Sequence, residues 1–268
     1  MKGSMKKCFQ EIANRFWGRM PEFPQPVFDD AEVACLGAVY RSVVLLCLAG
    51  FLLGQAAAQA LVSCLAAETW PAVSFGIGLL PFQVAAFGGA MAGLYPFRRR
   101  YGWRVLLAMP REGADVSAGV ARGVGLLLLF FPVLLAVNAS STWVCVRLGV
   151  PTPPQSLQYY ASQSPGVLFW VLAAVSVVIL APVTEEIMFR VIAYRAWRSL
   201  YPRQAAILTS AVFALAHVTP QYFPGLFLLG MVLQTAFRRG GVRLAIAVHA
   251  LYNLSSLLLF LSAQALGW

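Results

Sequence analysis

Long apolar stretches dominate this chain and restrict it to folds that reside in a lipid bilayer. Of its 268 residues, 60% are hydrophobic and 11% are charged, whereas soluble domains are about 45–50% apolar and about 25% charged. A helix crosses the hydrocarbon core with about 20 residues. The sequence therefore predicts an all-α polytopic membrane protein with about seven transmembrane helices. We expect these spans over 33–62, 72–95, 121–146, 166–190, 204–219, 223–237 and 242–265, of which the fifth and sixth are short enough to be half-buried or re-entrant.

The basic residues predict the orientation of these spans. Lysines and arginines lie before the first run and after the second, fourth and sixth runs. The intervening loops contain a single basic residue, Arg147. Because basic loops stay in the cytoplasm, we expect a cytoplasmic N-terminus and an outer C-terminus. Three regions follow from this layout: a cytoplasmic N-terminal segment over 1–32 with an interfacial amphipathic helix over 6–20, three transmembrane helices over 33–165, and a helical core over 166–268. The short loops favour a prokaryotic inner membrane, with the endoplasmic reticulum as the alternative.

Charge and cysteine content exclude several other classes. A net charge of +10 would indicate nucleic acid as the partner of a soluble protein. Here the basic residues lie in loops between apolar runs, so we expect the lipid bilayer as the partner and no nucleic acid. The five cysteines show no paired spacing, which argues against a zinc or disulfide framework.

Two adjacent carboxylates at the inner end of the fourth run are the strongest sign of function. Glu185 and Glu186 follow an uncharged apolar stretch, and Arg190 comes one helical turn later. Ionisable groups at such depth cost several kcal/mol unless they are paired or face water, so they mark functional sites by default. Glu186 and Arg190 are spaced i,i+4 and can form an ion pair. Glu185 points about 100° away on the helix and is left to react.

The only two histidines of the chain also lie inside apolar runs. His217 follows Phe213 in FALAH, and His249 precedes Asn253 by four residues in HALYN. These side chains suffice for peptide hydrolysis without a nucleophilic side chain. A carboxylate can deprotonate a water that one histidine positions, while a second histidine and an amide donate hydrogen bonds to the oxyanion.

These motifs carry a resemblance to a known family. EEIMFR, FALAH and HALYN, in this order in successive apolar segments, resemble the E-E-x-x-x-R, F-x-x-x-H and H-x-x-x-N/D motifs of the CAAX protease and bacteriocin-processing family. That family includes type II CAAX prenyl endopeptidases and glutamic intramembrane proteases. The resemblance covers about 166–260 and implies that Glu186 and Arg190 are structural or substrate-positioning partners.

The resemblance also implies roles for the remaining motif residues. Glu185 would be the catalytic base and His217 would join it on the water, while His249 and Asn253 would form the oxyanion site. We expect no cofactor. The alternative is a zinc enzyme with Glu185, His217 and His249 as ligands, although the sequence contains no H-E-x-x-H.

The expected activity is therefore that of an intramembrane endopeptidase acting on a membrane-associated or lipid-linked peptide or protein. Its substrate would carry a prenylated C-terminus, a leader peptide or a C-terminal sorting signal. Two alternatives stay open: a bacteriocin self-immunity or peptide-signal maturation protein of the same family, and a small proton-coupled transporter. The sequence leaves the oligomeric state open.

One geometric requirement follows from the depths of the two histidines. His217 lies 14 residues after Arg203, about 21 Å along a helix. His249 lies 6 residues after Arg243, about 9 Å. A common site therefore requires tilted or staggered helices, or a fifth helix that begins inside the membrane.

Overall fold

A computed structural model describes residues 30–64, 71–109, 116–154, 156–161 and 166–266 of the chain. Within these ranges the protein is helical and contains no strand. Four helical segments are long and apolar enough to cross a membrane, namely Cys35–Ala58, Gly123–Arg147, Val167–Arg198 and Pro220–Ala265. The predicted all-α polytopic membrane fold is thus confirmed. The N-terminal segment with its predicted interfacial helix over 6–20 lies outside the described residues.

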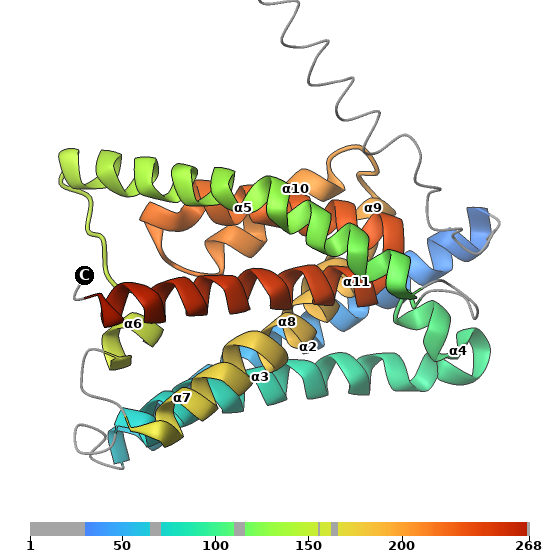
Figure 1. The fold of residues 1–268 in the computed structure, drawn as a ribbon. Coiled ribbons are helices and arrows are strands. Elements are labelled where there is room, and N and C mark those ends of the chain that lie inside the picture. The colour runs from blue at the N-terminus through green and yellow to red at the C-terminus, as the bar shows by residue number, and fades with distance from the viewer. Residues whose placement is uncertain (1–29, 65–70, 110–115, 155, 162–165, 267–268) are drawn as a thin grey trace, which may run out of the picture.

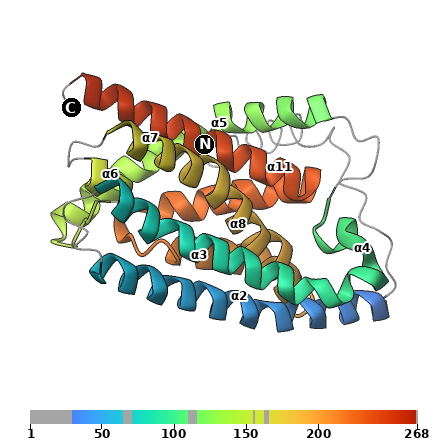
Figure 2. The same ribbon diagram turned by 90° about the horizontal axis from the view of Figure 1, so that it is seen from below.

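The first two predicted spans form a tightly packed antiparallel pair. Helix α2 (Asp30–Cys64) and helix α3 (Pro71–Leu94) lie side by side (Figure 2). Small residues make this approach possible, because a Cβ added at Gly50 would lie 2.6 Å from the Ala85 carbonyl oxygen, and one added at Gly89 would lie 2.9 Å from that of Leu46. Lipid tails are as apolar as the helix side chains, so burial of apolar surface does not hold membrane helices together. Close van der Waals packing of this kind drives their association instead. A short turn η2 (Tyr95–Phe97) and helix α4 (Arg98–Leu106) follow.

The last helix, α11 (Phe223–Ala265), joins the sixth and seventh predicted spans through a kink. Gly241 has φ of 68° there, a left-handed conformation that glycine adopts without steric cost. The Val242 N–H beside it donates to the Ala108 carbonyl at 3.1 Å, which ties the kink to the segment after α4. As Figure 1 shows, α11 lies between α5 (Val116–Arg147) on one side and the helical residues 167–198 on the other. A short helix α6 (Ser156–Ala161) follows α5.

The fourth predicted span is a continuous helix with two widened segments. It consists of α7 (Val167–Ala174), the π-helix η3 (Val175–Leu180), α8 (Ala181–Glu186), the π-helix η4 (Ile187–Ala193) and α9 (Tyr194–Arg198). We call this unit the 167–198 helix. π-helical turns are rare and occur frequently at functional sites, and here they flank the two adjacent glutamates.

The fifth predicted span is short, as expected from its sequence. Helix α10 (Ala205–Leu215) has 11 residues, about 16 Å, whereas the hydrocarbon core is about 30 Å thick. The chain then turns through Val218, whose φ is 52°, and re-enters a helical path at η5 (Pro220–Tyr222) and α11. Helix α10 is therefore too short to span the bilayer alone.

Candidate active site

The two adjacent glutamates occupy different environments. The side chain of Glu186 is fully buried, whereas that of Glu185 is 21% exposed. Consecutive residues of a helix point about 100° apart, so one carboxylate faces the packed core while the other lies at its edge. The Oε2 atom of Glu185 is buried and has no hydrogen-bond partner among the described residues. Buried polar atoms are nearly always paired, so this oxygen remains available to accept a hydrogen bond.

Arg190 holds Glu186 in the core. Its Nε lies 3.2 Å from Glu186 Oε2, and both side chains are fully buried. The Nη2 atom of Arg190 donates to the Gly230 carbonyl at 3.2 Å, which extends the pair from the 167–198 helix to α11. The predicted i,i+4 ion pair is present. Its burial means that neither charge has bulk water as an alternative partner.

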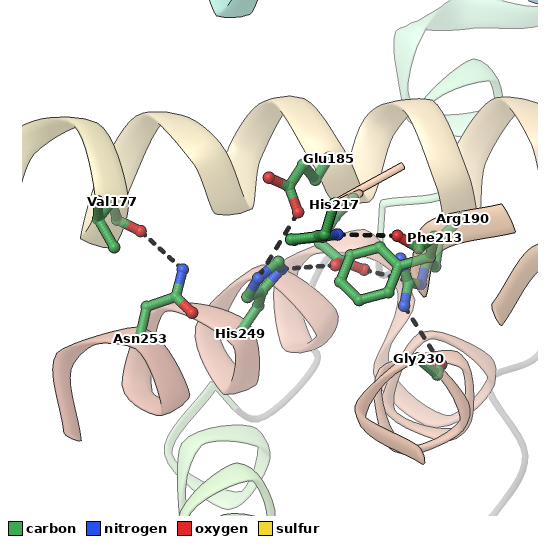
Figure 3. A network of polar contacts seen from close by, with 9 residues as sticks. Val177, Glu185, Arg190, Phe213, His217, Gly230, His249 and Asn253 are labelled. Atoms are coloured by element: carbon green, nitrogen blue, oxygen red, sulfur yellow. Dashed lines mark hydrogen bonds and ion pairs between the residues drawn. The ribbon is translucent and has the colours of Figure 1, made fainter. Parts of the chain in front are cut away.

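His249 connects both glutamates. Its Nδ1 lies 2.8 Å from Glu186 Oε1, and its Nε2 lies 3.8 Å from Glu185 Oε2. An ionised carboxylate can only accept hydrogen bonds, so Nδ1 carries the hydrogen and donates it to Glu186. The tautomer of His249 is thereby fixed, and Nε2 is turned toward Glu185 (Figure 3). Sequence reasoning placed Glu186 with Arg190 alone and missed this second bond, because no spacing rule relates residues 63 positions apart.

Phe213 brings the two histidines together. The centroid of its fully buried ring lies 4.9 Å from that of His217 and 5.9 Å from that of His249. The guanidinium of Arg190 lies 4.6 Å from the same ring centroid, a favourable cation–π distance. The different depths of the two histidines are therefore reconciled by the short helix α10, which ends close to the level of His249.

His217 is also fixed through Nδ1. This atom lies 2.8 Å from the Phe213 carbonyl oxygen (Figure 3), one of the terminal carbonyls that a helix leaves without a backbone donor. A carbonyl only accepts, so Nδ1 donates and Nε2 of the neutral ring is left as an acceptor. Both imidazoles thus use Nδ1 for anchorage and keep Nε2 available.

Asn253 meets the 167–198 helix one turn further along α11. Its Nδ2 donates to the Val177 carbonyl at 2.7 Å (Figure 3). The i,i+4 spacing from His249 places both side chains on one face of α11, as the sequence predicts. An amide nitrogen carries two hydrogens, so one N–H of Asn253 is committed to Val177 and one is left.

A metal centre is the alternative that the sequence left open for this site. Among the described residues, no group of three or more His, Cys, Asp or Glu side chains is arranged to hold a metal ion. The zinc alternative, with Glu185, His217 and His249 as ligands, stays a prediction.

A groove elsewhere on the protein is separate from these residues. It has a volume of about 710 Å³ and runs along α5 beside the start of α11. Its lining is mostly apolar and includes Pro132, Val133 and Pro224. None of the candidate active-site residues lines it.

Comparison with known proteins places this site in a family. Residues 167–255 match the model of the type II CAAX prenyl endopeptidase Rce1-like family. No curated protein and no solved structure matches the chain. The matched segment begins at the first residue of the 167–198 helix and includes all three motifs, from Glu185 to Asn253. The predicted resemblance to the CAAX protease and bacteriocin-processing family is therefore confirmed over residues 167–255, which form a type II CAAX prenyl endopeptidase Rce1-like domain within a multi-pass membrane protein.

Proposed function

We propose that this protein is an intramembrane endopeptidase in which Glu185 activates water to hydrolyse a peptide bond. The family indicates a CAAX-type protease. The observation that carries the finer assignment is the unpaired Oε2 atom of Glu185, 3.8 Å from the Nε2 atom of a histidine that Glu186 orients. That separation is too long for a direct hydrogen bond. A water molecule bound beside both atoms would satisfy them.

The chemical steps follow from these positions. Glu185 takes a proton from the water as its oxygen attacks the carbonyl carbon of the scissile peptide bond. His217, with its free Nε2 acceptor, helps to hold that water. His249 and Asn253 stabilise the oxyanion of the tetrahedral intermediate. Collapse of the intermediate breaks the C–N bond, and Glu185 returns its proton to the departing amine nitrogen. The second proton of the water passes from the new carboxylic acid to the amine, so the products are a carboxylate and an ammonium ion.

The charges of the site support the role of His249 as a donor. Two carboxylates and one guanidinium give this largely buried cluster a formal net charge of −1. In a medium of low dielectric constant an unbalanced charge is costly. To donate to the oxyanion, His249 Nε2 must carry a hydrogen in addition to the one on Nδ1 that binds Glu186. The developing oxyanion would then be met by a donor that is already oriented, the arrangement that contributes most to catalysis of acyl transfer.

Substitution of Glu185 tests this function directly. Purified protein in detergent would be incubated with a farnesylated CAAX peptide, and the termini of membrane proteins would be compared between cells that contain the wild-type protein or Glu185→Gln. We expect Glu185→Gln to abolish cleavage with an unchanged melting temperature, because glutamine fills the same space but cannot take a proton. Glu185→Asp keeps a carboxylate and should retain part of the activity. Full cleavage by Glu185→Gln would remove this residue from the mechanism, and proton-coupled uptake by vesicles without any cleavage would favour a transporter.

A further inference from the structure

A gap in the backbone hydrogen bonding of the 167–198 helix lies next to the candidate active site. The Ala181 N–H, which would reach Val177 in an ordinary α-helix, bonds instead to the Ser176 carbonyl in the π-helical pattern. In that pattern the next donor, to Val177, would come from residue 182. Residue 182 is proline, which has no N–H. The Val177 carbonyl is therefore left without a backbone donor at the end of η3.

The side chain that fills this gap comes from α11. Asn253 Nδ2 donates to the Val177 oxygen at 2.7 Å, across 76 residues of sequence. This bond is partly buried, and a carbonyl that is shielded from water and has no partner is costly, so the bond is favoured over free rotation of the amide. The bond fixes the plane of the Asn253 amide and hence the direction of its second N–H. Four residues earlier on α11, the bond that His249 Nδ1 donates to Glu186 fixes the His249 ring in the same way.

We propose that Pro182 is a positioning residue that withholds a backbone donor from Val177, so that the Val177 carbonyl can orient the Asn253 amide for the reaction. This inference rests on the proposed function, since it assigns the second amide N–H of Asn253 to the oxyanion. A donor that is held in place before the reaction costs no reorganisation when charge develops. Pro182 thereby acts on the reaction indirectly, through the hydrogen bond between the Val177 carbonyl and the Asn253 amide.

Pro182→Ala tests the effect on catalysis. The new N–H at residue 182 competes for Val177 and releases the Asn253 amide. With the farnesylated CAAX peptide we expect kcat to fall about tenfold, with KM within about twofold, because complete loss of an oxyanion donor costs about 100- to 1000-fold. In an Asn253→Ala background the same proline substitution should leave kcat unchanged, since both changes act on one bond. Pro132→Ala, which removes a proline inside α5, is the matched control and should keep the wild-type kcat.

Thermal unfolding tests the hydrogen bond to the Val177 carbonyl independently of peptide cleavage. Asn253→Ala leaves the Val177 carbonyl unpaired, and adding Pro182→Ala supplies the missing N–H. We expect the double variant to melt about 2–4 °C above Asn253→Ala, the shift that corresponds to one hydrogen bond. A wild-type kcat for Pro182→Ala, an equal loss in the Asn253→Ala background, or a double variant no more stable than Asn253→Ala would each overturn the inference. If the wild-type protein cleaves nothing, the proposed function fails, while the melting temperatures still decide whether Asn253 closes the gap left by Pro182.

Discussion

Replacing Arg190 by methionine should destabilise the protein far more than replacing a surface arginine. Arg190 and Glu186 are both fully buried and form an ion pair at 3.2 Å. Removing one partner of such a pair leaves an uncompensated charge in the core and costs about 3–5 kcal/mol. The methionine fills much of the arginine volume, so the loss reports mainly on charge. It also removes the cation–π contact with Phe213 at 4.6 Å, which contributes about 2 kcal/mol when desolvated.

The expected change is large enough to measure by thermal unfolding in detergent. At about 2–4 °C for each kcal/mol, a loss of about 3–5 kcal/mol lowers the melting temperature by about 6–20 °C. Arg203→Met is the matched control, because Arg203 lies on an exposed turn after the same helix. We expect it to stay within about 2 °C of the wild type, since surface substitutions usually change stability little.

A second substitution separates loss of charge balance from loss of packing. Glu186→Gln in the Arg190→Met protein removes the stranded carboxylate but keeps an oxygen that accepts the His249 Nδ1 hydrogen bond. We expect the double variant to recover more than half of the lost stability, because the two residues are directly coupled. A melting temperature for Arg190→Met close to that of the wild type would refute the buried-pair reasoning. So would a double variant that is less stable than Arg190→Met alone.

Two further predictions concern helix packing and topology. Gly230→Ala should lower both the melting temperature and peptide cleavage, because its Cβ would lie 2.9 Å from Ser210 Cβ and 3.0 Å from Ser210 Cα, which forces α10 away from α11. Gly88→Ala, where an added Cβ meets nothing within 4 Å, should change neither measurement. A reporter enzyme that is active only in the cytoplasm should be inactive when it is fused to the C-terminus in a bacterial host, as the distribution of basic residues predicts. An active C-terminal fusion would reverse the proposed orientation.

Much of the fold follows from the sequence because the bilayer leaves few choices. A backbone in lipid must satisfy its own hydrogen bonds, so each long apolar run becomes a helix. The run around 166–190 therefore had to place Glu185 and Glu186 on a membrane helix, and the shortness of 204–219 indicated that α10 does not cross alone. Spacing within a single helix was equally reliable. The pairs Glu186–Arg190 and His249–Asn253 are four residues apart and share a face in any α-helix.

Contacts between helices were decided only by the tertiary structure. The bond from His249 to Glu186 and that from Asn253 to Val177 depend on how α11 crosses the 167–198 helix. Crossing angle and depth are set by side-chain packing, which hydrophobic periodicity does not encode. The two π-helical segments are a second reason why these contacts could not be predicted. They shift the register of the backbone, and no residue pattern predicts that shift. The sequence thus determined which polar groups enter the membrane, and the packing of short and kinked helices determined which of them meet.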